Sequence, residues 1–481
     1  MRLEGKSLKS DFLRFIIPSI IAQWVFSLYT MVDGIFVARG VSEVALTAVN
    51  ISMPFTTGLF SISILFAVGN STIVAILLGQ GEKERANEVF TQNVVLLCTL
   101  SVLITILVIV FLEPFARFLG ATDNILSYAK TYIGTIAPFS MVYILSYSFE
   151  TLIKTDGYPK LATIYVTSGS VLNCILDYIL VMVLHKGVWG AAFATGISQA
   201  AVILLYLWHF LGPKGTIRFS KFHLMPSEIW RQIRNGMSSG VTEFSSGIII
   251  FFFNQAILKY IGEYALVSYT IISYVNTIVV MSMAGIAQGS QPLISYYYGK
   301  NEPGKYKKLL KYGITAALVG SVGAVVVCYM GAGGIVRLFL KESEASLIKY
   351  SVRVFRIFIL SFLIAGLNVV LGGYFTSVER AGFATMISLT RSLVALVISL
   401  VFLTAVFGGE AIWWAPVIAE SCCVVLALLL SLLFFQGKII GTREGTILTA
   451  LLTGLVVKRF VRLLQSPLER RLRGNAPQIS A

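Results

Sequence analysis

The sequence predicts an all-α polytopic membrane protein with twelve transmembrane helices in two pseudo-symmetric bundles of six. Three observations lead to this fold class: the apolar composition, the recurrence of long apolar runs, and an internal repeat. Of the 481 residues, 56% are hydrophobic and only 13% are charged, whereas a soluble protein of this length needs a much larger polar surface. The chain is therefore expected to lie in a lipid bilayer.

The apolar runs are about 20 residues long or longer, which is the length at which a helix crosses the hydrocarbon core. The first run, Phe12 to Val37, is too long for a signal-peptide core and is expected to be the first transmembrane helix. The spans of the first half are expected near residues 13–38, 45–78, 91–112, 125–152, 160–184 and 189–211. Those of the second half are expected near residues 236–258, 265–298, 310–331, 347–375, 383–407 and 412–435.

These runs and the polar stretches between them divide the chain into four regions. Residues 1–211 are expected to form an N-lobe with helices 1–6, residues 212–235 a cytoplasmic linker, and residues 236–435 a C-lobe with helices 7–12. Residues 436–481 are expected to form a basic amphipathic cytoplasmic tail, because their apolar stretch is too short to span and is followed by Lys and Arg residues. A partner-docking segment and a segment foreign to the rest of the protein are the alternatives for this tail.

The basic residues indicate the orientation. The net charge is +15, and the Lys and Arg residues gather in the N-terminal arm, the middle linker, the loop 300–311 and the tail. All four clusters fall on one side of the membrane if the N-terminus is cytoplasmic, in accord with the positive-inside rule. Both termini are therefore expected in the cytoplasm. Because these clusters lie beside anionic lipid, the positive charge does not indicate a nucleic-acid partner.

The two halves of the sequence resemble each other. The stretch Val44–Glu82 aligns with Tyr264–Glu302 at an offset of about 220 residues. Six spans bring the chain back to the same side of the bilayer, so the halves are expected to be parallel repeats related by an axis along the membrane normal. In transporters built in this way, the substrate and ion sites lie near the midplane, and the halves rock to expose them alternately.

Polar residues inside the spans are the candidates for chemistry, because a carboxylate at a helix centre costs about 2.5–3.5 kcal/mol on insertion scales. Asp33 lies in the first span, and Asn173 and Asp177 lie four residues apart on one face of the fifth. Thr195 in the sixth span adds a hydroxyl. These oxygens suit a small cation, with Na⁺ as the candidate metal ion at Asp33, Asn173 and Asp177, and the acids can instead carry a proton. The alternative is that these groups only hydrogen-bond neighbouring helices.

Three further acids are candidates for substrate binding. Glu150 ends the fourth span and is either a cavity acid or an interfacial charge. Glu243 lies early in the seventh span and offers a cation contact in the second half. Glu420 follows Pro416, whose missing backbone hydrogen bond suits a bend that lines a cavity. Each of the three can instead be satisfied structurally by its neighbours.

Several motifs resemble those of the multidrug and toxic compound extrusion (MATE) family of the MOP flippase superfamily. They are Tyr29…Asp33…Phe36-Val-Ala-Arg39, Asn173-Cys-Ile-Leu-Asp177 and Gln288-Gly-Ser-Gln-Pro292-Leu-Ile-Ser-Tyr-Tyr-Tyr-Gly299. Each motif is weak alone, but their order, their spacing and the half-repeat agree from residue 10 to about 435. The chain looks most like the bacterial branch with its key acids in the N-terminal half, and its tail departs from the family pattern.

This resemblance implies a secondary active antiporter that exports organic cations and drugs in exchange for protons or sodium by alternating access. It implies an N-lobe ion site at Asp33, Asn173, Asp177 and Thr195. The repeat partner of Asp33 is Phe253, and that of Asp177 lies near Phe402, so the ion site is expected in the first half only. The implied location is the bacterial cytoplasmic (inner) membrane, and a monomer without cofactors is expected.

Other functions fit the sequence less well. A flippase for lipid-linked oligosaccharides or lipids, from the same superfamily, is the alternative, but such proteins line the cavity with several cationic residues, whereas this chain offers acids. The predicted spans contain no continuous polar stripe of the kind that lines an ion channel. The histidines are scattered, the five cysteines lie in apolar runs and no phosphate-binding loop is present, so an enzyme is not expected.

Overall fold

The structure is a computed structural model that describes residues 7–213, 215–340 and 345–435. Twelve helical segments within these residues are long and apolar enough to cross a membrane, which confirms the predicted number of spans and the all-α class. The predicted tail, residues 436–481, lies outside the described residues.

The N-lobe comprises the first six spans. Its helices are α1 (Leu8–Gly40), α2 (Glu43–Gln80), α3 (Lys83–Val110), α4 (Leu112–Phe118), α5 (Asp123–Ile136), η1 (Ala137–Phe139), α6 (Ser140–Asp156), α7 (Pro159–Asp177), the π-helical turn η2 (Tyr178–Val183) and α8 (Gly187–Leu211). Helix α2 ends at Gly81 and α6 at Gly157, both with positive φ, which lets the chain turn directly into the next span.

The C-lobe comprises the last six spans. Its helices are α9 (Pro226–Tyr260), α10 (Tyr264–Gly299), α11 (Pro303–Arg337), α12 (Ala345–Phe358), η4 (Ile359–Ser361), α13 (Phe362–Ser377), α14 (Ala381–Leu389), the π-helical turn η5 (Thr390–Val394), α15 (Ala395–Phe407), η6 (Gly409–Trp414) and α16 (Ala415–Phe435). Helices α9 and α11 begin with Pro226 and Pro303 at their first position, where the missing N–H breaks no hydrogen bond.

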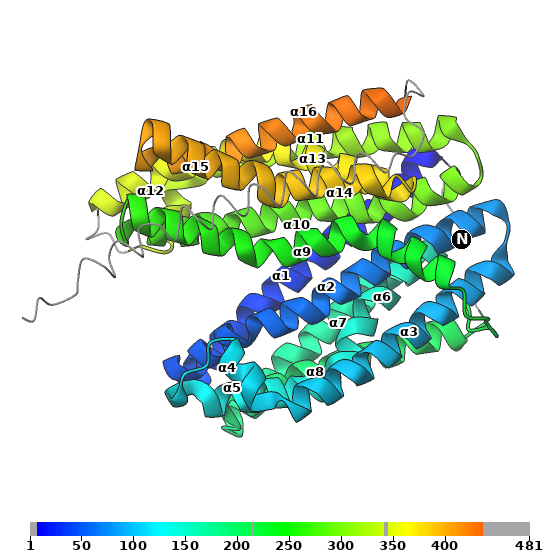
Figure 1. Cartoon of the computed structure of the whole chain (residues 1–481), viewed down its shortest axis with the longest axis horizontal. Helices are drawn as coiled ribbons and strands as arrows, with labels where there is room; N and C mark the ends of the chain where they lie inside the picture. Colours follow the sequence, from blue (N-terminus) through cyan, green and yellow to red (C-terminus); the bar gives the residue numbers. More distant parts are fainter. Residues whose placement is uncertain (1–6, 214, 341–344, 436–481) are drawn as a thin grey trace, which may run out of the picture.

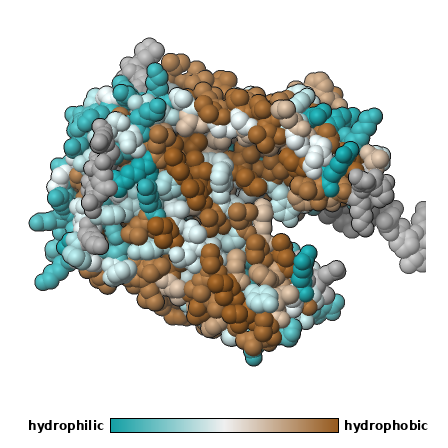
Figure 2. Space-filling model, turned by 180° about the vertical axis from the view of Figure 1, so that it is seen from behind, coloured by the Kyte–Doolittle hydropathy of each residue, from teal (hydrophilic) through white to brown (hydrophobic). Residues whose placement is uncertain are grey.

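The lobes lie side by side, in contact at one end of the molecule and apart at the other (Figure 1). Figure 2 shows a cleft between them at the open end, and a broad hydrophobic band over the outer surface. Large apolar side chains such as Leu204, Val319 and Val327 are 68%, 69% and 69% exposed. Exposed apolar side chains on helices of this length are what a lipid environment requires.

The lobes meet through four helices, with α2 packed against α9 and α1 against α10. Glycines allow the backbones to approach closely here: a Cβ atom at Gly236 would overlap the carbonyl of Leu65, and one at Gly69 would overlap that of Gln232. The first turns of α1 also cross the boundary, because Phe15 belongs to the buried core of the C-lobe. The start of α1 therefore ties the two lobes together.

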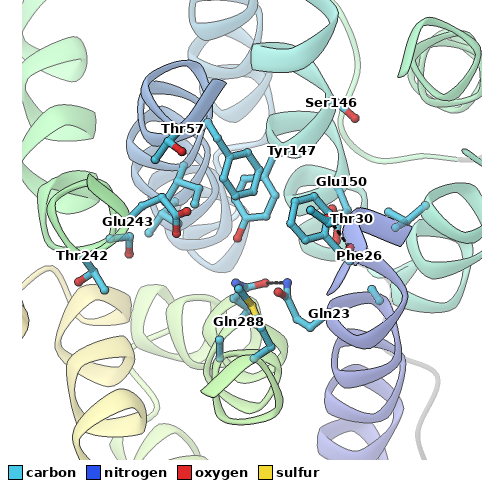
Figure 3. Close-up of a pocket in the computed structure, with 18 of the residues that line it drawn as sticks. Gln23, Phe26, Thr30, Thr57, Ser146, Tyr147, Glu150, Thr242, Glu243 and Gln288 are labelled. Carbon is cyan, nitrogen blue, oxygen red and sulfur yellow. Dashed lines mark hydrogen bonds between the residues drawn. The ribbon is translucent and has the colours of Figure 1, made fainter. Parts of the chain in front are cut away.

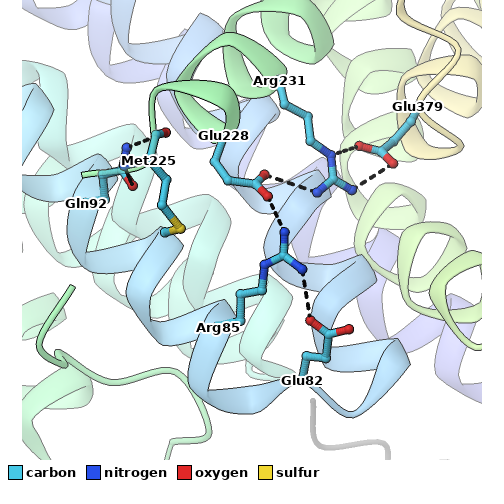
Figure 4. Close-up of polar contacts among 7 residues, drawn as sticks. All are labelled: Glu82, Arg85, Gln92, Met225, Glu228, Arg231 and Glu379. Carbon is cyan, nitrogen blue, oxygen red and sulfur yellow. Dashed lines mark hydrogen bonds and ion pairs between the residues drawn. The ribbon is translucent and has the colours of Figure 1, made fainter. Parts of the chain in front are cut away.

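A chain of charged side chains joins the lobes at the closed end (Figure 4). Arg85 of α3 contacts Glu228 of α9 at 2.7 Å. Arg231, one turn later, contacts Glu228 at 3.1 Å and holds both carboxylate oxygens of Glu379, at 2.6 and 2.9 Å. Glu379 lies in the turn between α13 and α14 and has a positive φ of 54°. Asn235 donates a further hydrogen bond to Glu379, at 3.0 Å.

The helix that carries this network begins earlier than the sequence predicts. Helix α9 begins at Pro226, inside the segment 212–235 that the sequence suggests is a linker. The additional turns carry Glu228 and Arg231, whose charges hide them from a hydropathy pattern. The loop before them is fixed to α3, because Gln92 donates to the Met225 carbonyl at 3.1 Å and accepts from its N–H at 3.3 Å.

Candidate functional site

A cavity of about 450 Å³ lies between the two lobes. This volume is within the usual range for a small-molecule site. Its walls come from α1, α2, α5, α6, α7 and α8 of the N-lobe and from α9, α10, α13, α14 and η5 of the C-lobe. At its floor, Gln23 of α1 donates to Gln288 of α10 at 2.9 Å, so the lobes also meet through a polar contact inside the cavity (Figure 3).

The four residues predicted for ion binding come together on the N-lobe side of this cavity. Asp33, Asn173 and Thr195 line the cavity, and Asp177 lies behind them, fully buried. The Asn173 amide donates to the Thr195 hydroxyl at 3.4 Å. Asp33 and Asp177 lie close enough for their carboxyl groups to interact, and two neighbouring carboxylates repel unless a proton or a cation lies between them.

The oxygens of this cluster have no protein partner. Within the described residues, one oxygen of Asp33, the side-chain oxygen of Asn173 and both oxygens of Asp177 are buried and accept no hydrogen bond. A buried oxygen without a partner is costly, and the great majority of such groups in proteins are satisfied. Within the described residues, no group of three or more His, Cys, Asp or Glu residues is arranged to hold a metal ion. The donors of the cluster are carboxyl, amide and hydroxyl oxygens.

Local structure explains how α7 supplies two of the four residues. Asn173 and Asp177 are one turn apart and share a face of the helix. Asp177 is the last residue of α7, and the π-helical turn η2 follows it directly. Such π-helical segments break the regular hydrogen-bond pattern and are common at functional sites. The change of helical pitch thus begins immediately after the buried acid.

Residues that were not predicted as site residues also surround this cluster. Tyr29, Tyr132 and Gln199 line the same side of the cavity. Tyr29 stands in the motif that contains Asp33 and precedes it by four residues, about one helical turn, so its spacing could have assigned it to the site. Tyr132 and Gln199 come from α5 and α8, and no local pattern connects them with Asp33.

The three acids predicted for substrate binding differ in their surroundings. Glu150 lines the cavity but pairs at 2.5 Å with Lys154, whose side chain is 2% exposed. Glu243 of α9 lines the cavity and forms no ion pair with the described residues. Glu420 does not line the cavity and lies behind Arg391, to which it is joined at 2.8 Å. Glu243 is therefore the acid best placed to meet a cation.

The C-lobe position equivalent to Asp33 is part of an aromatic core. Phe253 is 1% exposed and stacks on Tyr269 with 4.5 Å between ring centroids. The ring of Trp413 is tilted against Phe253, with 6.3 Å between the ring centroids. The other expected partner, Phe402, lies on the exposed surface. At these two positions the C-lobe has no carboxylate to match the N-lobe cluster.

Comparison with known proteins identifies the family. A sequence profile of MatE matches residues 18–179 and 241–401, one segment in each lobe, as the internal repeat requires. The chain belongs to the MatE family. Membership places this MATE protein among multi-pass membrane transporters, not among enzymes.

The sequences of named relatives align with most of this chain. The multidrug export protein MepA of Staphylococcus haemolyticus (strain JCSC1435) is 24% identical over 427 residues, which cover 88% of this chain and 93% of that protein. MepA of Staphylococcus aureus (strain MRSA252) is 23% identical over 440 residues, covering 90% and 95%.

Solved structures show the same fold. A multidrug resistance MATE family transporter of the MOP superfamily, in an outward-facing conformation, superposes with a TM-score of 0.83 at 21% identity, covering 94% of this chain and 99% of that chain. MATE in complex with MaL6 gives a TM-score of 0.83 at 22% identity, covering 92% and 97%.

Proposed function

We propose that this MATE protein is a secondary active antiporter that exports organic cations, drugs among them, in exchange for protons or sodium ions. The observation that carries the proposal is the group of partnerless, buried oxygens of Asp33, Asn173 and Asp177 beside an interlobe cavity of about 450 Å³. Such oxygens supply a place for an exchangeable ion, and the cavity supplies a place for its counter-substrate.

The ion occupies the N-lobe cluster. A proton or a sodium ion between Asp33 and Asp177 removes the repulsion between their carboxylates. Asn173 and Thr195 contribute an amide oxygen and a hydroxyl oxygen, both suitable ligands for sodium. Without the ion, the pair of acids presents negative charge to the cavity and attracts an organic cation. Ion and substrate therefore exclude each other, which is the condition for obligatory exchange.

The organic cation occupies the interlobe cavity. Phe26 stacks on Phe60 with 5.4 Å between centroids, and Tyr147 meets Phe60 edge-on at 5.4 Å, so flat aromatic surfaces border the site. A cation near such rings is stabilised by about 0.5–2 kcal/mol per ring, depending on how far it is desolvated. Glu243 adds a negative charge on the opposite lobe (Figure 3). Together these features favour flat, apolar molecules with a positive charge.

The proposed orientation places both termini in the cytoplasm of a bacterial cell, with the protein a monomer in the inner membrane. The closed end, where α1 begins (Figure 1), then faces the cytoplasm. The cavity then opens outward in this structure. The opposite state requires the Arg85–Glu228 contact between the lobes to break and the glycine contacts of α2 and α9 to separate. The interlobe interface at the closed end is thus the gate that rearranges during exchange.

A flippase function has less support from the cavity. Arg391 is the one Lys or Arg among the described residues that line it. A flippase for lipid-linked oligosaccharides is expected to present several cationic residues to the phosphates of its substrate. The acids of this cavity favour a positively charged cargo.

The test is export of ethidium from vesicles reconstituted with the purified protein, under a proton gradient or a sodium gradient imposed separately. We expect export with one of the two gradients, and loss of that export in Asp177→Asn with no loss of folded protein in the membrane. Folded wild-type protein that exports ethidium under neither gradient would overturn the proposal, and wild-type export by Asp177→Asn would overturn the ion site.

A further inference from the structure

A single basic side chain faces an otherwise acidic cavity. Arg391 lies in the π-helical turn η5 of the C-lobe and lines the cavity between the lobes. The acids Asp33, Glu150 and Glu243 line the same cavity. A cavity designed only for cations would gain nothing from a guanidinium in its wall, because the positive charge repels the substrate. Arg391 therefore needs a separate explanation.

The guanidinium is held from behind and leaves most of its donors unused. Its Nε donates to Glu420 at 2.8 Å, and the other oxygen of Glu420 accepts a hydrogen bond from Asn368 at 2.6 Å. Asn368 also donates to the backbone carbonyl of Glu420, at 2.9 Å. Neither Nη atom of Arg391 donates a hydrogen bond to the described residues. A guanidinium has five N–H donors, so the two terminal groups are available to a ligand.

The orientation of Arg391 is fixed by its neighbours. The side chains of Arg391 and Glu420 are 15% and 13% exposed. Glu420 does not line the cavity, whereas Arg391 and Asn368 do. The side-chain oxygen of Asn368 is buried and accepts no hydrogen bond within the described residues. Glu420 thus acts as a positioning residue behind Arg391, and the polar atoms without partners belong to the two residues in the wall.

We propose that Arg391 binds the carboxylate of zwitterionic amphiphiles whose positive group interacts with the acids of the same cavity. The proposal rests on the proposed export function and adds to it the residue that recognises an anionic group of the substrate. Guanidinium and carboxylate match as planar groups that form two parallel hydrogen bonds. Because Nε is engaged by Glu420, the two Nη groups supply these bonds.

Electrostatics separates this role from simple charge neutralisation. If Arg391 only neutralised Glu420, replacing both by uncharged residues would affect cationic and zwitterionic ligands alike. If Arg391 binds a carboxylate, the same replacement weakens the zwitterion selectively. The informative quantity is therefore the ratio of two affinities within one protein, and general changes in folding or cavity shape cancel in that ratio.

Rhodamine 110 and its methyl ester rhodamine 123 are suitable probes, because the first carries a free benzoate and the second does not. Binding of each dye to the purified full chain is measured by fluorescence polarisation for wild type and for Arg391→Gln/Glu420→Gln. We expect the double variant to lower the affinity for the acid relative to the ester about 10-fold or more, the factor typical of a charge-assisted pair of hydrogen bonds. An unchanged ratio would overturn the proposal.

A second variant keeps Arg391 and Glu420 intact in case their joint removal prevents folding. Ser388 lines the cavity three residues before Arg391, so the carboxylate of Ser388→Glu can occupy the free guanidinium donors. We expect Ser388→Glu to lower the acid-to-ester affinity ratio by a similar factor. A ratio equal to that of wild type, in folded protein that binds the ester, would overturn the proposal.

Export by the wild-type protein distinguishes failure of this inference from failure of the proposed function. Both dyes are loaded into vesicles at zero membrane potential, clamped with valinomycin and equal potassium, because the zwitterion and the cation carry different net charges. Export of both dyes is expected. Export of the ester alone overturns the zwitterion proposal and leaves cation antiport standing. Export of neither dye overturns the antiport function, and the zwitterion proposal with it.

Discussion

Replacing Lys154 by Met removes the partner of a carboxylate that the fold buries. Lys154 and Glu150 are 2% and 10% exposed and lie 2.5 Å apart. With an effective dielectric constant of about 20, the attraction at this distance is on the order of 6–7 kcal/mol, and much of it offsets the desolvation of the two charges. Removing one member of a buried pair typically costs about 3–5 kcal/mol, because the other charge stays buried without compensation. We expect a loss of this size for Lys154→Met.

Neutralising both partners should recover most of that stability, because no buried charge remains. The assay compares apparent melting temperatures in detergent at one scan rate for wild type, Lys154→Met and Glu150→Gln/Lys154→Met. The matched control is Lys130→Met, which breaks a pair with Glu113 whose side chains are 39% and 44% exposed, and we expect only a small shift there. A Lys154→Met protein that melts with wild type, or a double variant that melts no higher than Lys154→Met, would refute the reasoning.

Three further predictions concern the gate and the driving force. Gly236→Ala should hold the closed end apart, because its Cβ would overlap the Leu65 backbone. Labelling of a cysteine at that end should therefore increase. The control is Gly247→Ala, which has open space around it and should label like wild type. Glu228→Gln should weaken the contact with Arg85 of the other lobe and increase the same labelling several-fold, and unchanged labelling would contradict the role of this contact. For one-to-one exchange of a monovalent cation, a potassium diffusion potential should leave ethidium export unchanged. Faster export with the interior negative relative to the outside would indicate that more than one ion enters for each cation exported.

Hydropathy predicted the number of spans because lipid contact demands long apolar runs, but it misplaced several starts. The third span is predicted near 91–112 and found at Lys83–Val110, and the ninth is predicted near 310–331 and found at Pro303–Arg337. Their first turns are charged or polar, so hydropathy does not detect them. Pro303 at the helix start was a local signal that could have corrected the boundary.

The candidate site was predictable only in part. The shared face of Asn173 and Asp177 follows from their spacing, and so does the pairing of Glu150 with Lys154, four residues later. The meeting of Asp33 with Asp177 came from the family resemblance, because contacts between α1 and α7 leave no local pattern. The same limit applies to Arg391 and Glu420, which lie on different spans. Glu420 was therefore predicted to be an acid in the cavity wall, whereas it lies behind Arg391 and forms an ion pair with it.

The two aspartates of the cluster are placed for different tasks, since Asp33 lines the cavity and Asp177 does not. An organic cation in the cavity reaches Asp33, while only a proton or a small ion reaches Asp177. Asp33→Asn should then weaken both ethidium binding and ion coupling. Asp177→Asn should abolish ion-driven export while its ethidium affinity stays within about threefold of wild type, or about 0.65 kcal/mol, because ethidium does not reach Asp177. Titrating both purified variants with ethidium by fluorescence polarisation checks the difference. Equal losses of affinity in the two variants would mean that ion and substrate compete through the whole cluster and not through Asp33 alone.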